Sequence, residues 1–149
     1  MSREGDFATR MLADTTLMAT LTGGVYTSGT VGAEGITRDA TPAAFGTGGW
    51  LMPCALVRQR GNVPTGDVVD YNDRTASARQ IVEVWLYEDR AYTAIDTAAA
   101  RIYTLFQGHV LGGTFEIRLA NSIDRQRDQG ALSGASLARL DYEVVSIIN

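Results

Sequence analysis

The stretch at 79–108, RQIVEVWLYEDRAYTAIDTAAARIYTLFQG, constrains the fold more than any other part of the chain. Its first part alternates as a β-strand does, and it predicts a strand over 78–87. Both sides of this strand are partly apolar, which is typical of a central strand that is covered on one face and in contact with something on the other. One side carries Val82, Val84 and Leu86, and the other carries Ile81, Glu83, Trp85 and Tyr87.

The second part of the same stretch predicts a helix over 90–107, because its apolar residues recur at helical spacing. Asp89 is the expected N-cap, and Gly108 ends the helix. The expected apolar stripe consists of Ala91, Ile95, Ala98, Ile102, Leu105 and Phe106. A strand, a tight turn and a long helix thus form the best-defined unit of the sequence.

Two short helices are expected before this unit. Asp6 or Ser2 can cap the first, and Asp14 can cap the second, which covers TTLMATLT and stops at Gly23 and Gly24. Their expected inner residues are Phe7, Met11 and Leu12 in the first, and Leu17, Met18 and Leu21 in the second. The VYT that follows the two glycines is a candidate for a brief strand.

Three more strands complete the prediction. One lies at roughly 51–60, after a glycine-rich region, and two alternating strands, TFEIRLA and LARLDYEVVSII, close the chain on either side of a polar loop, NSIDRQRDQGALSGAS. The inner residues of the closing strands are Phe115, Ile117, Leu119, Leu140, Tyr142 and Val144. The sequence therefore predicts a single α+β domain over 1–149, with a mostly antiparallel sheet of about four strands, two to three helices packed on one face, and long glycine-rich loops.

The charged residues exclude several functions. Arginine supplies all 13 cations and lysine is absent, so a Walker-type phosphate loop, a Schiff-base lysine and a lysine general base are excluded. A net charge of −4 argues against wrapping nucleic acid, which requires a basic stripe, but not against surrounding a passage for it. No apolar run approaches the ~20 residues that span a bilayer, and a cytoplasmic start is expected.

No catalytic, cofactor-binding or metal-ligating set is predicted. His109 follows a helix stop and is expected at the surface, and no nucleophile elbow accompanies it. One histidine and one cysteine cannot supply the usual ligands of a zinc site, and Cys54 lies in an apolar run, where a buried, inert thiol is expected. The triplet Asp67, Asp70 and Asp73 does not fit the calcium-loop pattern; a solvated loop, a subunit contact, an acidic lining and a metal site remain open for it.

Two features favour assembly with other proteins. Trp85 lies on the strand face that also carries Glu83, and aromatic residues are enriched in interface cores, although Trp85 covering core beneath a loop is the alternative. The run DRQRDQ at 124–129 alternates acid and arginine, which suits pairing across an interface as well as a solvated loop. The full set of predicted interface residues is Arg58, Arg60, Asp67, Asp70, Asp73, Arg74, Glu83, Trp85, Asp124, Arg125, Arg127 and Asp128.

The order of these elements resembles that of the tail-completion proteins of tailed phages. The resemblance rests on the opening MLADTTLMATLTGGVYT, the strand LMPCALVRQRG after a glycine-rich loop, the unit at 79–108, and the closing strand LARLDYEVVSI. It is a pattern of elements and hydrophobic spacing over most of the chain rather than an invariant motif. The long glycine-rich region at 27–50 departs from compact members of the family.

The resemblance implies a tail terminator, a virion protein that assembles in the host cytoplasm. Such a protein forms a ring, expected to be a homo-hexamer, at the head-proximal end of a long tail, where it ends tube growth and joins the tail to the head. The implied partners are other copies of the chain, the tail-tube protein and a head–tail connector or stopper protein. DNA passes through the ring without specific binding, and neither a cofactor nor a membrane is involved.

Three other functions remain open. Another neck or tail component, such as a stopper, a head-completion protein or a tube subunit, is the nearest. A small-ligand-binding module would use Trp50 or Trp85 to line a pocket. An enzyme of unusual type would depend on His109 or on the acidic triplet.

Overall fold

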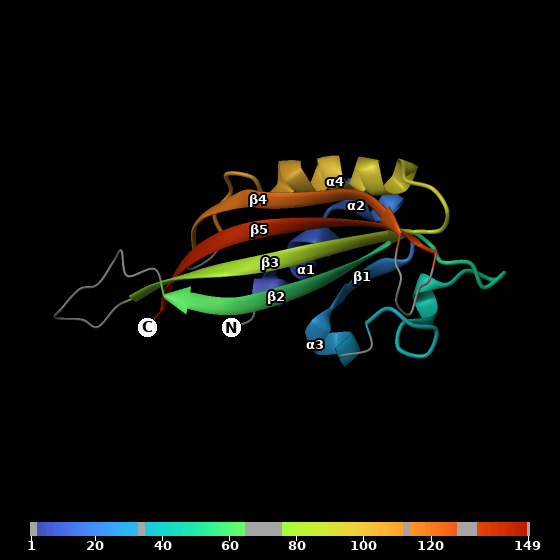
Figure 1. Ribbon diagram of the computed structural model, residues 1–149, viewed down its shortest axis with the longest axis horizontal. Helices are drawn as coiled ribbons and strands as arrows, with labels where there is room; N and C mark the ends of the chain where they lie inside the picture. The colour runs from blue at the N-terminus through green and yellow to red at the C-terminus, as the bar shows by residue number, and fades with distance from the viewer. Residues whose placement is uncertain (1–2, 33–34, 65–75, 112–113, 128–133, 149) are drawn as a thin grey trace.

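The computed structural model describes residues 3–32, 35–64, 76–111, 114–127 and 134–148, which form an α+β fold (Figure 1). In chain order the elements are α1 (Arg3–Ala13), α2 (Thr15–Thr20), β1 (Gly24–Thr27), α3 (Ser28–Val31), the 3-10 helix η2 (Pro42–Ala44), β2 (Cys54–Pro64), β3 (Ala76–Glu88), α4 (Thr93–Phe106), β4 (Thr114–Arg127) and β5 (Ser136–Ile148). The predicted fold class is confirmed.

The strands form one sheet in the order β1-β2-β3-β5-β4. Strand β3 is central and pairs antiparallel with β2 and with β5, and β4 pairs antiparallel with β5. Strand β1 runs parallel to β2, and the connection that such a pair requires contains α3 and η2. The described sheet thus has five strands where about four were expected, and its one parallel pair makes it mixed.

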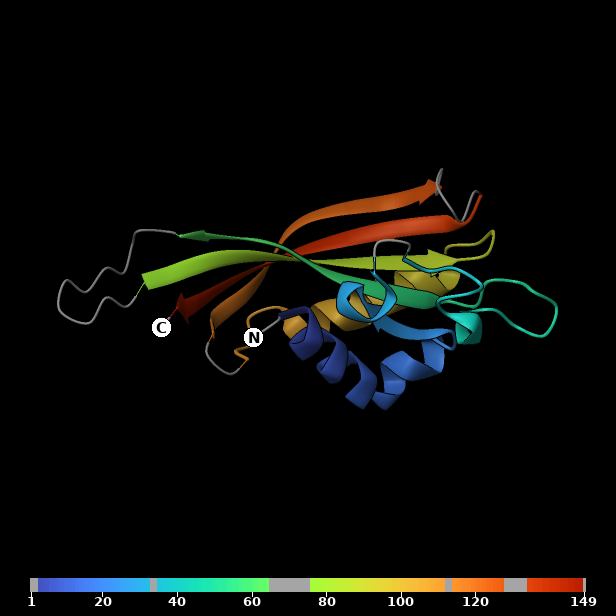
Figure 2. The same cartoon turned by 90° about the horizontal axis from the view of Figure 1, so that it is seen from below.

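The main core lies between the sheet and helices α1, α2 and α4, which cover one face (Figure 2). At its centre Phe7 and Phe106 stack with their ring centroids 4.1 Å apart, and Tyr142 packs against both rings. The helix stripes are confirmed apart from Leu12, which is 51% exposed, and Ala91, which lies outside the helix and is also exposed. Within the described residues, no helix is long and apolar enough to cross a membrane.

The other face of the sheet is covered at one end by part of the glycine-rich region. Residues Val31, Ile36 and Ala44 pack on it and form a second hydrophobic cluster with Cys54, Leu56, Tyr87 and Leu137. The Cys54 side chain is fully buried, and burial raises the pKa of its thiol to about 12. The second contact expected for the strand at 78–87 is therefore in part the chain's own 31–51 segment.

Helix α4 begins later than predicted. Asp89 does not cap it, because Glu88 takes that role: its Oε2 accepts hydrogen bonds from the backbone N–H of Ala94 (3.0 Å) and of Ile95 (3.2 Å). Between the end of β3 and the start of α4, Arg90 has a φ of 62°. This conformation turns the chain out of the strand before the helix can start. The helix ends as expected, with Gly108 at a φ of 74°.

Strand β4 is longer than predicted. The loop expected from 121 is instead strand as far as Arg127, which pairs with Ser136 of β5. Its register shifts three times, between Thr114 and Ile117, Leu119 and Asn121, and Ile123 and Gln126. An edge strand with bulges and exposed polar side chains carries no alternating apolar pattern, and the sequence prediction was wrong there for that reason.

Asp14 joins the N-terminal helices to α4. Its Oδ2 accepts the backbone N–H of Leu17 (2.9 Å), so it caps α2 as predicted. Both of its oxygens also bind Arg101 of α4, with Nε–Oδ2 at 2.8 Å and Nη2–Oδ1 at 2.7 Å. These bonds to Arg101 and Leu17 lower the pKa of Asp14 from 3.8 to about 2.

We expect Asp14→Asn to lower the thermal stability at neutral pH, because the charged form of Asp14 is the one that the fold stabilises. The folded pKa is depressed, so this stabilisation is complete above the unfolded value near 3.8 and is lost as the pH falls through about 2. The difference in melting temperature between the wild type and the variant should therefore shrink steadily below pH 4. An equal difference at pH 2 and pH 7, measured by circular dichroism, would contradict this role.

Tyr142 offers a test of the core. Its ring is fully buried, and its hydroxyl has no hydrogen-bond partner among the described residues. Tyr142→Phe should leave the free energy of unfolding unchanged or raise it by about 1 kcal/mol, since it removes an unpaired polar group without changing the packing. The matched control is Tyr92→Phe, which removes a 2.9 Å bond to the carbonyl of Gln126 and should be mildly destabilising in urea titrations.

Candidate functional site

The residues considered for chemistry do not form a reactive centre in the described part of the chain. No three His, Cys, Asp or Glu side chains lie close enough to hold a metal ion among the described residues. His109 is exposed, as expected, and its Nδ1 lies 3.2 Å from Nη2 of Arg10. The predicted interface residues Asp67, Asp70, Asp73, Arg74 and Asp128 lie outside the described residues.

The face of the sheet that lacks the helices carries a cluster of charges beyond the 31–51 cover. We call it the charged ladder: Arg58 and Arg60 of β2, Glu83 of β3, and Arg139 and Asp141 of β5. The strand register sets Arg58 opposite Glu83 and Glu83 opposite Asp141. Three antiparallel strands thus bring residues that are distant in the sequence onto one row of one face.

The acidic members of the ladder are buried beneath the basic ones. Glu83 is 8% exposed and Asp141 is 3% exposed. Glu83 Oε2 lies 3.7 Å from Nη1 of Arg60 and 3.7 Å from Nη1 of Arg139. Arg139 Nε lies 3.0 Å from Oδ1 of Asp141. Because each buried carboxylate has a guanidinium beside it, the face is charged but locally compensated.

Trp85 lies next to the ladder on the same face, two residues along β3 from Glu83. Its register partners are Leu56 and Arg139, and the guanidinium carbons of Arg58 and Arg139 lie 5.8 Å and 5.3 Å from its ring. Trp85 also packs against the second hydrophobic cluster. Trp85 thus closes part of the core, and its indole sits between two arginines on a partly open face. Its role in an interface stays a prediction.

The remaining predicted residues lie elsewhere, at the end of β4. Arg125 Nη2 lies 3.0 Å from Oδ2 of Asp96 in α4, and Asp124 accepts a 2.9 Å hydrogen bond from the hydroxyl of Ser122. Arg127 Nη1 is 3.4 Å from the carbonyl oxygen of Gly134. The structure therefore divides the described candidates between two places, the ladder and the β4 end, instead of joining them in one site.

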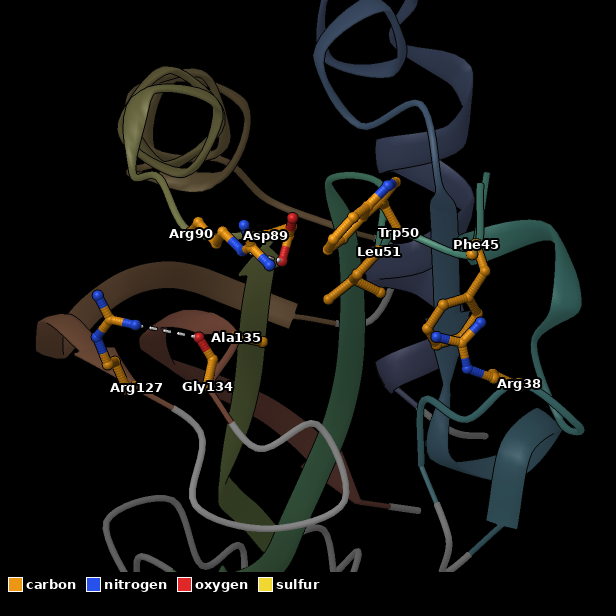
Figure 3. A pocket seen from close by; sticks show the side chains of 10 residues that line it. Arg38, Phe45, Trp50, Leu51, Asp89, Arg90, Arg127, Gly134 and Ala135 are labelled. Atoms are coloured by element: carbon orange, nitrogen blue, oxygen red, sulfur yellow. Dashed lines mark hydrogen bonds and ion pairs between the residues drawn. The ribbon is translucent and has the colours of Figure 1, made fainter. Parts of the chain in front are cut away.

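Sequence reasoning missed two members of the ladder. Arg139 and Asp141 alternate with the inner residues predicted for the closing strand, and neither was named as an interface residue. The available signal was their alternation, which matches that of Glu83 and Trp85, but the pairing of β5 with β3 was needed to place them together. The sequence also offered Trp50 as one of two candidate pocket residues. In the structure Trp50 is 56% exposed and lines an open pocket of about 790 Å³ (Figure 3).

The comparisons with known proteins concern the fold. Neither the protein-family models nor the curated proteins contain a match to this sequence. Among solved structures, a chain in the virion of a native gene transfer agent (GTA) particle matches with a TM-score of 0.63 over 97% of this chain and 94% of that one. The two chains are 15% identical. They share a fold over nearly their whole lengths.

We expect Glu83→Gln to lower the free energy of unfolding by about 2 kcal/mol, because Arg60 and the largely buried Arg139 would lose their shared counter-charge. The matched control is Glu116→Gln in the exposed pair with Arg118, where the side chains are 45% and 69% exposed; it should change little. Equal losses for the two variants in urea titrations would show that the ladder is no more than surface charge.

Proposed function

We propose that this chain is a structural protein of a phage-like virion. The observation that carries the proposal is the shared fold with a chain of the gene transfer agent virion, which extends over 97% of one chain and 94% of the other. A partial match could reflect a common supersecondary unit, but a match of this extent includes the order of helices and strands. A structural role also requires no reactive centre.

Within the virion, the proposed role is that of a tail terminator. The elements that carry the resemblance to tail-completion proteins recur in the structure: the Asp14-capped helix before β1, strand β2, the unit of β3 and α4, and the closing strand β5. The protein would form a ring, which we take to have six copies, at the head-proximal end of a long tail. The ring would end tube growth and join the tail to the head through a connector or stopper protein.

The subunit contacts in such a ring are heterologous, so two different surfaces of each copy meet. The charged ladder with the neighbouring Trp85 is a suitable candidate for one of them, since together they offer an indole and paired arginines on a partly open face. Its most exposed member is Arg60, with 59% of the side chain exposed, and Arg79 of β3, outside the ladder, is 50% exposed. A net charge of −4 would let DNA slide through the lumen, because an acidic wall does not hold phosphates.

The direct test is the mass of the purified protein by light scattering over a concentration series, with negative-stain images of the same samples. Closed rings of uniform size with a hole wide enough for duplex DNA are the expected result. Open filaments would favour a tube subunit. A monomer that also fails to bind the ends of tubes made from the same virus's tube protein would contradict the proposal.

A charge reversal tests the ladder as a ring contact. Arg60→Glu should raise the concentration at which rings form by at least about tenfold, because it places a like charge beside the buried Glu83 at the rim of the contact. Arg118→Glu, on an exposed position of edge strand β4, is the matched control and should leave ring formation unchanged. If the two variants assemble alike, the ladder is not the contact.

A further inference from the structure

The open pocket at one end of the sheet is not part of the ladder. Its described lining residues come from four separate places: the 38–51 segment, the turn between β3 and α4, the end of β4 and the two residues before β5 (Figure 3). The lining residues are Arg38, Phe45, Gly49, Trp50, Leu51, Asp89, Arg90, Arg127, Gly134 and Ala135. Its volume of about 790 Å³ is within the range of ligand sites.

Two arginines of this pocket are held against aromatic rings. The guanidinium carbon of Arg38 lies 4.8 Å from the centroid of Phe45, and that of Arg90 lies 4.6 Å from the centroid of Trp50. Gly49, at a φ of 79°, leaves room for Arg38: a Cβ there would lie 2.9 Å from Nη1. Both cations are therefore positioned before any ligand arrives.

The described residues that line the pocket carry more positive than negative charge. Its third arginine, Arg127, is bonded to the carbonyl of Gly134. In the part of the chain that the structure describes, neither Arg38 nor Arg127 has a carboxylate within 4 Å, and Arg90 has only the adjacent Asp89, at 3.9 Å. Among the described lining residues, three arginines thus stand against one carboxylate, in a chain whose net charge is −4. Oriented guanidinium groups without counter-charges suit a ligand that bears carboxylates.

The backbone at Arg90 supports a binding role. A φ of 62° is uncommon for a residue other than glycine, asparagine or aspartate. Glycine would fit the turn with less strain, but it could not place a guanidinium over Trp50. Strain of this kind is found where a side chain is needed at a fixed position.

The chain contains an acidic segment that matches the pocket. Residues 65–75 read TGDVVDYNDRT, with three aspartates against one arginine. The segment joins Pro64 of β2 to Ala76 of β3, and Figure 1 shows these strand ends at the opposite end of the sheet from the turn between β3 and α4, whose Asp89 and Arg90 line the pocket. The two strand ends that flank the segment therefore lie at one end of a copy and the pocket lies at the other, and a head-to-tail contact joins two such different surfaces.

We propose that the pocket binds the 65–75 segment of the neighbouring copy, with Arg38 and Arg127 pairing its aspartates and Trp50 covering its apolar and tyrosine side chains. The inference rests on the proposed ring in taking a second copy as the partner. A nucleic acid is the less suitable ligand, because Asp89 lies in the pocket and the chain as a whole repels phosphates.

The test uses the full chain and a fluorescently labelled TGDVVDYNDRT peptide with blocked ends, read by fluorescence polarisation at low salt. The peptide should bind, and its affinity should fall at least about tenfold in the double variant Arg38→Gln/Arg127→Gln. Arg118→Gln is the matched control and should bind as the wild type does. A peptide with Asp67→Asn, Asp70→Asn and Asp73→Asn should not bind.

Four results overturn the proposal: no binding of the native peptide, equal binding by the double variant, equal binding of a scrambled peptide of the same composition, and displacement of the peptide by a single-stranded oligonucleotide at a lower concentration. The first two exclude the pocket as the site. The third assigns it to acidic peptides in general, and the fourth to nucleic acid. Rings without peptide binding would leave the proposed function intact and remove only this inference.

Assembly supplies a second readout. Chains with Arg38→Glu/Arg127→Glu and chains with Asp67→Arg/Asp70→Arg/Asp73→Arg should each fail to form rings alone, because like charges then meet at the contact. Mixed in equal amounts, they should form rings with the two chains alternating, since every contact again joins opposite charges. If the single variants form rings, or if the mixture stays unassembled while the wild type forms them, the proposal is wrong.

Discussion

The burial of both faces of β3 is the constraint on which the rest of the structure depends. Val82, Val84 and Leu86 have no exposed surface on the helix side, and on the other side Tyr87 lies under the 31–51 cover while Glu83 lies among arginines. A strand with two covered faces has to be flanked by partners on both edges, and β2 and β5 supply them. Each layer of the molecule is thus positioned by its contact with this one strand.

The parts of the fold that could be predicted are those in which local pattern and tertiary packing agree. The alternation in β3 and β5 and the stripe of α4 follow directly from what the core buries. Asp14 could be predicted as a cap because its role is set by the residues directly after it. The cap of α4 could not, because Glu88 reaches the helix only through the turn that the φ of Arg90 creates.

The same reasoning applies to the candidate surfaces. Glu83 and Trp85 could be identified because they share a strand face with apolar neighbours. Arg139 and Asp141 belong to the same cluster only because β5 pairs with β3. The local sequence of neither strand predicts that pairing. The pocket was harder still to predict from the sequence, since its arginines come from three separate connections or strand ends. Predicting a surface that spans several strands requires the sheet topology, whereas predicting one face of a single strand or helix requires only the period of its apolar residues.

The buried thiol of Cys54 has a practical consequence. Burial raises the pKa of this thiol from 9.0 to about 12, so its reactive thiolate is far scarcer at neutral pH than that of an exposed cysteine. The side chains of the sequence also include no lysine amine. A cysteine introduced at an exposed position would therefore be the dominant target of a maleimide dye, so that distances between copies could be measured by energy transfer without first removing any native residue.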